Sequence, residues 1–429
     1  MQRAERQGRV RRLKAYPVYL ILAGITAMLM AARDIAMALY FVREVGMNPF
    51  QLVFAGTVFM IAVVVCEVPT GVVADVYSRR LSVIIGAFVV GAALLLEGLV
   101  PSYGPILVAQ ALWGIGLTFN RGALEAWIAD ELPSKAELGH VYLRGAQAGY
   151  VGALAGIGLG VVLASVRLNL VSVTAGVCMV ALGVFLAFAM PETGFSPTPR
   201  AGHRAWHVAG ETMHDGLRLV RRSAILPLVM GIVFFLGMSS ETYDRLWEVH
   251  FLTNFQFPGG ARFGPILWFG VIGAGGLVLS FITAEVARRR LDTATHLGAV
   301  RVLLLIDVGL MLSMVAFGLA GNFEVALAAY WFAYLLRRTN HPLFAAWLNQ
   351  SLEPRVRATV ISMSGQVDAV GQIAGGPAFG AIATAAGTHA AMVAAGLVLA
   401  PAALLYLRVR NRGDAVVEPA AVRKSTAEG

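Results

Sequence analysis

Long apolar runs alternate with short polar segments along nearly the whole chain. Each run holds about 20 residues, the length that spans the hydrocarbon core of a bilayer. Because an unpaired peptide group costs several kcal/mol in lipid, each run is predicted to be a helix. Twelve runs are recognised, near residues 16–42, 50–74, 81–100, 105–129, 141–164, 170–190, 224–250, 263–287, 296–319, 324–348, 358–383 and 388–409.

Residues 191–223 interrupt this alternation and divide the runs into six plus six. This segment is polar and contains three prolines, so it is predicted to be a linker, either flexible or with an amphipathic helix near 205–222. The chain is therefore predicted to be an all-α membrane protein with twelve transmembrane helices in two six-helix bundles. The predicted parts are a basic tail (1–15), a first bundle (16–190), the linker (191–223), a second bundle (224–409) and a second tail (410–429).

The composition agrees with a membrane protein: 58% of the 429 residues are hydrophobic, 14% are charged, and the mean hydropathy is +0.71. Arginines gather in both tails and in the polar segments after the second, sixth, eighth and tenth runs, which fall on one side of an alternating topology. The positive-inside rule therefore predicts that both termini are cytoplasmic. We therefore expect a multi-pass protein of the plasma membrane. The net charge of +9 is explained by this topology, and nucleic-acid binding is not expected without a soluble domain to carry it.

The two halves share marked positions at matching places. The segment Gly71–Arg80 contains Asp75, Arg79 and Arg80, and adding 210 leads from these to Glu285, Arg289 and Arg290. An ordered series of such matches indicates a duplication into pseudo-symmetric halves, a plan known in transporters. The other matches are Asp34 with Asp244 at the same offset, and Asn120 with Asn340 and Ala126-Trp127 with Ala346-Trp347 at an offset of 220.

With these features the chain resembles the major facilitator superfamily over about residues 15–410. Gly71, Asp75, Arg79 and Arg80 match the family signature between helices two and three, although Val76 and Ser78 replace its usual basic residue and glycine. Pro191-Glu192-Thr193 after the sixth run is also typical. The resemblance implies a transporter that works by alternating access, and it names no substrate.

The resemblance also implies a role for the segment between helices two and three. Asp75 is expected to face the start of the eleventh span, and Arg79 to pair with Asp130 at the end of the fourth. Together with Gly71 and Arg80, these residues would form a latch that holds the two halves in the outward-open state and releases on inward opening. The alternative is that Arg79 and Arg80 only determine topology.

Ionisable residues inside spans are the other candidates, because each costs at least about 2.5 kcal/mol at the bilayer centre unless it meets a partner or water. We expect most of them to line a cavity between the halves, with Asp34, Asp244 and Asp368 favoured as the carboxylates that change protonation. Arg121 and Glu125 are expected to form a structural i, i+4 ion pair. The cavity or coupling candidates are Arg33, Asp34, Glu241, Asp244, Arg245, Arg337, Arg338, His341, Asp368 and Gln372.

Several other chemistries are not expected. The chain has no P-loop motif for a nucleotide and no Cys-x-x-Cys spacing for a metal. The glycines of span five lie mid-membrane, where close helix packing explains them better than a phosphate loop. We therefore expect no enzymatic activity, no cofactor, no metal and no catalytic residue.

Signatures of drug–proton antiporters are incomplete in this chain. Gln110 stands where their span-four arginine is expected, and Gly156-Ile157 replaces their span-five Gly-Pro pair. An apolar, aromatic-rich set of span residues nevertheless suits amphipathic organic molecules. The members of that set are Trp113, Phe119, Trp127, Phe235, Trp247, Trp268 and Phe344.

The first functional hypothesis is therefore export of small amphipathic organic compounds, driven by protons as the coupling ion, by a monomer in the lipid bilayer. The alternative is uptake or exchange of an organic anion, with Arg33, Arg245, Arg337 or Arg338 as counter-charge. A third hypothesis of another class is a membrane sensor that does not transport, which the lack of an appended soluble domain disfavours.

Overall fold

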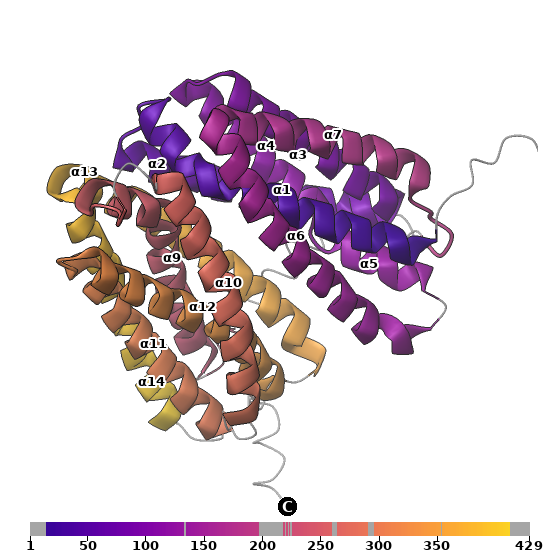
Figure 1. Ribbon diagram of the computed structural model, residues 1–429. Helices are drawn as coiled ribbons and strands as arrows, with labels where there is room; N and C mark the ends of the chain where they lie inside the picture. The colour runs from indigo at the N-terminus through magenta and orange to yellow at the C-terminus, as the bar shows by residue number, and fades with distance from the viewer. Residues whose placement is uncertain are drawn as a thin grey trace, which may run out of the picture. The chain divides into compact units, whose positions relative to one another are not determined.

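The computed structural model describes residues 14–132, 134–196, 218, 220–221, 223, 225–259, 264–290, 296–352 and 354–411. A few side chains inside these ranges, among them those of 284–290, are not described. By internal contacts the chain forms two compact units, residues 1–46 with 58–206 and residues 47–57 with 207–429 (Figure 1). The second helix thus begins in the second unit and continues in the first.

The first unit is built entirely from helices in its described part. Its longest helices pair side by side: α1 packs against α6, and α3 packs against both α4 and α7. The elements are α1 (Ala15–Arg43), α2 (Pro49–Val72, shared with the second unit), the π-helix η1 (Val73–Tyr77), α3 (Arg79–Leu99), α4 (Tyr103–Asn120), α5 (Ala123–Glu131), the 3-10 helix η2 (Lys135–Glu137), α6 (Leu138–Val166) and α7 (Asn169–Ala189).

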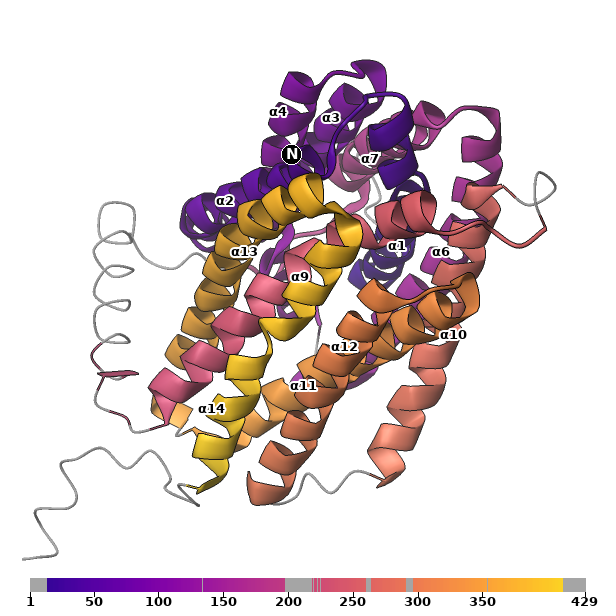
Figure 2. The ribbon, with the colours of Figure 1, turned by 90° about the vertical axis from the view of Figure 1, so that its left-hand side faces the viewer.

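The second unit is also helical throughout its described part. In it α9 packs against α13 and α14, and α11 packs against α12 (Figure 2). Its elements are α9 (Leu226–Asn254), α10 (Pro265–Arg290), α11 (His296–Leu319), α12 (Phe323–Ser351), α13 (Pro354–Leu397) and α14 (Ala400–Asn411). The repeat segment Ala284–Arg290 lies at the end of α10, where the backbone is helical and the side chains are outside the description.

The helices account for the twelve predicted spans. Within the described residues, nine helical stretches are long and apolar enough to cross a membrane. The last of these, Thr359–Asn411, covers two spans, because Gly387 at φ 86° breaks the helix near its middle. The two remaining spans are α4 with α5 and α12. Most of the predicted linker and both tails lie outside the described residues, so their predicted structure stays a prediction.

Side-chain caps define several helix starts. At the start of α2, the Asn48 side chain accepts a hydrogen bond from the Gln51 backbone N–H at 2.9 Å, and the Gln51 side chain accepts one from the Asn48 N–H at 3.0 Å. This reciprocal capping box satisfies amide groups that a helix leaves without partners, and Pro49 supplies a pre-set first turn. Asn322 caps α12 with a single bond, accepting from the N–H of Val325 at 2.9 Å.

Glycines allow the same close helix contact in both units. A Cβ at Gly152 or Gly156 of α6 would overlap the backbone of α1 at Gly24 or Met28. A Cβ at Gly371 or Gly375 of α13 would likewise overlap the backbone of α9 at Phe234 or Met238. The α1 and α9 positions differ by 210, and the glycine positions differ by 219. The predicted internal repeat therefore extends to the backbone contacts between its helices.

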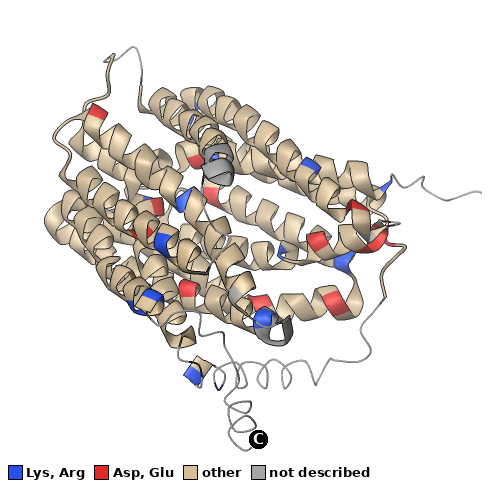
Figure 3. Ribbon diagram, turned by 90° about the horizontal axis from the view of Figure 1, so that it is seen from below, with Lys and Arg blue, Asp and Glu red and all other residues tan. Residues whose placement is uncertain are grey.

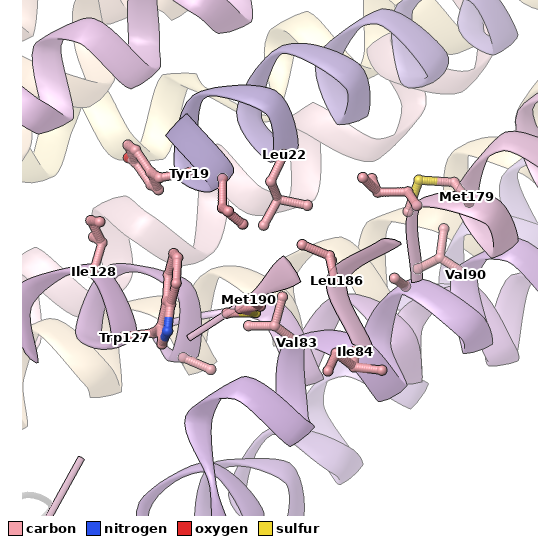
Figure 4. Packing of buried hydrophobic residues seen from close by; sticks show 14 of the residues in the cluster. Tyr19, Leu22, Val83, Ile84, Val90, Trp127, Ile128, Met179, Leu186 and Met190 are labelled. Carbon is pink, nitrogen blue, oxygen red and sulfur yellow. The ribbon is translucent and has the colours of Figure 1, made fainter. Parts of the chain in front are cut away.

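Each unit has its own apolar core. In the first unit, Trp127 and Ile128 of α5 pack with residues of α1, α3 and α7 (Figure 4). In the second unit, Trp347 of α12 packs with Tyr406 of α14. The two tryptophans are each 1% exposed and occupy matching repeat positions, so they are core residues of their units.

Charged positions are sparse along the helices (Figure 3). Large apolar side chains such as Val151, Phe281 and Leu305 are more than 70% exposed, as expected for a surface that meets lipid. Against this background, the few charges inside the spans mark the candidate site.

Candidate functional site

An ion pair joins α9 and α12 of the second unit. Both guanidinium nitrogens Nη1 and Nη2 of Arg337 donate to the Asp244 carboxylate, at 2.6 and 2.8 Å. Such a two-point bond holds the geometry of both side chains. The side chain of Asp244 is 54% exposed while that of Arg337 is 26% exposed, so the carboxylate is the accessible partner.

A stack of aromatic rings lies beside this pair. Tyr330 is nearly parallel to Tyr243, with ring centroids 5.4 Å apart and planes 6° apart. Trp247 and Tyr334 also stack on Tyr330, with interplanar angles of 28° and 27°. The Arg337 guanidinium lies 5.0 Å from the buried Tyr243 ring, so the cation packs against the stack.

Further polar residues complete this face of the second unit. Arg338 is exposed, lies over the Tyr334 ring at 5.2 Å and donates to its hydroxyl at 3.1 Å. On α13, Gln372 donates to Asp368 at 2.7 Å. The backbone carbonyl of Asp368 lies against Gly237 of α9, where a Cβ would overlap it. The structure therefore brings together predicted candidates from α9, α12 and α13.

Glu241 and Arg245 form the ion pair expected from their i, i+4 spacing, with Nε and Oε1 3.1 Å apart. Glu241 is buried, and Gly56 at the start of α2 lies directly against both side chains, where a Cβ would overlap the carboxylate. This pair is more enclosed than the Asp244 pair, so we regard it as a packing contact between α9 and α2.

The first unit contains a second charged cluster, centred on Arg33 and Glu97. Arg33 is completely buried and donates to both oxygens of Glu97, at 2.8 and 2.5 Å. It also lies 3.4 Å from the carboxylate of Asp34, whose side chain is 61% exposed. The guanidinium stacks over Trp113 at 4.1 Å. Arg33 is thus neutralised inside its unit, and Asp34 is the accessible acid beside it.

The sequence interpretation did not include Glu97 among the candidates. Gln110 donates to its carboxylate at 3.2 Å and Ser172 at 2.8 Å, so Glu97 connects four helices of the first unit. Gln110 stands where drug–proton antiporters are expected to carry arginine, and here Arg33 of α1 supplies the positive charge. The sequence does carry a signal for this role, because Glu97 is the single acidic residue of its apolar run.

The segment between α2 and α3 contains the residues proposed as a latch. Arg79 forms an ion pair with Asp130 and donates to the carbonyl of Ala126 at 3.0 Å. Asp75 is 62% exposed and lies 3.9 Å from Arg79. A Cβ at Gly71 would meet nothing within 4 Å, so close packing inside the unit does not require that glycine. The expected partner of Asp75 belongs to the other unit, and the latch role stays a prediction.

Ser78 explains one departure from the family signature. Its backbone is extended, a conformation open to any residue, so glycine is not needed at this position. Its hydroxyl accepts from the N–H of Leu81 at 2.9 Å as the N-cap of α3, and it donates to Glu192 at 2.7 Å. Glu192 also accepts from the Arg80 N–H at 3.0 Å. The segment after α7 is thereby fixed to the start of α3.

Arg121 and Glu125 do not form the predicted pair. The α4 helix ends at Asn120, Gly122 adopts φ 71°, and α5 begins at Ala123. This break removes the helical i, i+4 geometry, and no ion pair between them occurs in the described part of the chain. Both side chains are exposed.

The sequence profile described as the Major Facilitator Superfamily matches residues 19–339. The chain belongs to the Major Facilitator Superfamily. It is also 22% identical over 365 residues to YxaM of Bacillus subtilis (strain 168), an uncharacterized MFS-type transporter, covering 85% of this chain and 88% of the relative. This major facilitator protein is accordingly a multi-pass integral membrane protein, and its family is one of transporters.

Solved structures support the major facilitator fold. The nucleoside transporter NupG matches with a TM-score of 0.73 at 12% identity, covering 92% of this chain and 99% of that one. A POT family transporter in complex with 5-aminolevulinic acid matches with 0.71 at 12% identity, covering 92% and 96%. A bacterial homolog of the human lysosomal transporter Spinster, inward-facing and unoccupied, matches with 0.69 at 15% identity, covering 93% and 98%. At these identities the likeness shows the fold of this major facilitator protein alone.

Proposed function

We propose that this major facilitator protein is a secondary active transporter that exports small amphipathic organic compounds in exchange for protons, by alternating access. The observation that carries the proposal is the Asp244–Arg337 pair beside the ring stack. It combines an accessible carboxylate with a cation and aromatic rings, of which Trp247 and Tyr334 are only partly buried, features that suit proton exchange for an amphipathic compound.

A proton on Asp244 would cancel the charge that holds Arg337. The two charge-assisted hydrogen bonds at 2.6 and 2.8 Å would then weaken, and Arg337 would be released toward substrate or solvent. Asp34 beside Arg33 and Asp368 beside Gln372 are the other candidates for the same step.

The test uses the purified protein in liposomes with an internal pH indicator. Adding amphipathic compounds to one side is expected to move protons through the wild type and not through Asp244→Asn, whose side chain keeps its shape but cannot titrate. Glu324→Gln is the matched control, because Glu324 is an exposed carboxylate in the first turn of α12. Absence of proton movement across a broad panel, with insertion verified, would contradict the proposal.

Uptake or exchange of an organic anion is the second candidate function. Of its four proposed counter-charges, Arg33, Arg245 and Arg337 each pair with a carboxylate. Arg338 has no carboxylate within salt-bridge distance among the described residues, so this candidate rests on Arg338. It requires inward accumulation of a carboxylated solute that Arg338→Gln abolishes while the protein stays folded; outward transport of the same solute would reject it.

A further inference from the structure

The guanidinium of Arg338 has no carboxylate within salt-bridge distance in the described part of the chain. Its one hydrogen-bond partner among the described residues is the Tyr334 hydroxyl, whereas a guanidinium carries five N–H donors. The Asp244 carboxylate, which pairs with the neighbouring residue Arg337, already uses both of its oxygens there. Arg338 therefore has donors left for an external acceptor.

The position of Arg338 on α12 argues against contact of its guanidinium with lipid, whether with the tails or with the headgroups. Tyr330, Tyr334, Arg337, Arg338 and His341 follow helical spacing along one face, which we call the polar face of α12. The exposed apolar side chains of α12, Val325 and Phe332, lie on the other side of the helix.

Depth gives the second argument. From Phe323 to Arg338 the helix rises about 22 Å, and from Arg338 to Ser351 it rises ~20 Å. Arg338 thus lies near the middle of its span, away from the phosphates of both leaflets. A cation at this depth needs water or an anionic partner.

The ring stack defines the shape of that partner. Tyr243 and Tyr330 are buried, while Tyr334, the last ring of the stack, is half-buried beneath the Arg338 guanidinium. Because Tyr334 is only half-buried, part of its ring stays available for the offset or edge contact that a ligand ring prefers. A carboxylate attached to that ring would reach the N–H edge of Arg338, whose planar fork matches it in two-point geometry.

We propose that the polar face of α12 binds an aromatic carboxylate, with Arg338 holding the carboxylate and Tyr334 the ring. The assignment rests on the proposed transport function and names the substrate class for it. His341, exposed one helical turn beyond Arg338, is a second donor for the same anion.

The test measures binding of 2-naphthoate to the full-length protein in nanodiscs by calorimetry, without a pH gradient. Comparison probes are 2-naphthamide, which keeps the ring without the charge, and cyclohexanecarboxylate, which keeps the charge without the aromatic ring. The wild type is expected to bind 2-naphthoate at least about tenfold more tightly than 2-naphthamide, because charged two-point bonds are stronger than neutral ones. It should bind 2-naphthoate about threefold to tenfold more tightly than cyclohexanecarboxylate, which cannot make the aromatic contact.

Arg338→Gln is expected to weaken 2-naphthoate binding about tenfold or more and to leave 2-naphthamide binding unchanged. Arg338→Lys, which keeps the charge but not the fork, should lie between, and Tyr334→Leu should weaken the naphthoate by about threefold to tenfold. Arg301→Gln, an exposed arginine of α11, is the control and should bind as the wild type does.

Equal binding of naphthoate and naphthamide, no binding of naphthoate to the wild type, or normal binding in a folded Arg338→Gln protein would overturn the assignment. The proton-movement experiment in liposomes tests the proposed transport function independently of this binding measurement. Naphthoate binding that depends on Arg338 without any proton movement keeps the site and rejects proton-coupled export. Proton movement driven only by uncharged or cationic compounds keeps the export proposal and rejects the site.

Discussion

The Glu97 carboxylate receives two hydrogen bonds from the Arg33 guanidinium, although the two residues are 64 positions apart in the sequence. The side chains of Glu97 and Arg33 are 2% and 0% exposed, so water cannot take the place of either charged partner. Buried pairs of this kind tolerate the loss of one member poorly. Without the Glu97 charge, Arg33 would keep only the longer contact of 3.4 Å to the exposed Asp34 carboxylate.

Glu97→Gln is therefore expected to destabilise the protein by about 3–5 kcal/mol. Replacing both members, as Arg33→Leu with Glu97→Leu, should recover much of that loss, since no isolated charge remains. Thermal unfolding in detergent measures both, with Glu44→Gln at an exposed site as control. A single substitution as stable as the wild type would show that water or another group replaces the pair.

Gly156 is expected to tolerate no side chain. Gly156→Ala would place a Cβ against the backbone of Met28 on α1, and such overpacking costs about 1–3 kcal/mol. Gly158→Ala is the matched control two positions away, where nothing lies within 4 Å and alanine favours the helix. The changes in unfolding temperature relative to the wild type should differ between the two variants in sign or clearly in size. Equal stability of the two variants would contradict the close contact.

Ser78 and Glu192 are expected to be coupled. Ser78→Ala removes the N-cap of α3 and a hydrogen bond to Glu192, with an expected cost of about 1–2 kcal/mol. In a double-mutant cycle with Glu192→Gln, the sum of the two single losses of stability should exceed the loss in the double mutant. Strict additivity in unfolding measurements would mean that the two side chains do not interact in the membrane.

The Asp244–Arg337 pair is expected to matter for transport more than for stability. Asp244 is 54% exposed, so Asp244→Asn should cost no more than ~1 kcal/mol. Its transport rate in liposomes is expected to fall at least about tenfold, because the carboxylate can no longer exchange a proton. Thermal unfolding and flux are measured on the same preparation, and a loss of stability as large as that of Glu97→Gln would assign the pair a structural role instead.

The helices and the repeat could be predicted from the sequence because both depend on local or periodic patterns. A span needs about 20 apolar residues wherever it stands, so the runs of hydrophobic residues indicated all twelve. The same holds for Glu241 and Arg245, which pair across one turn of an unbroken helix. Arg121 and Glu125 have the same spacing, but the backbone break at Gly122 separates them.

Ion-pair partners of distant residues required the tertiary structure. Arg33 pairs with Glu97 at a separation of 64 positions, and Arg337 with Asp244 at 93, because packed helices bring these side chains together. No spacing rule connects such residues. The sequence by itself therefore determined a duplicated twelve-helix membrane protein and its ionisable span positions. Only helix packing decided which of those charges are neutralised and left Arg338 without a carboxylate partner among the described residues.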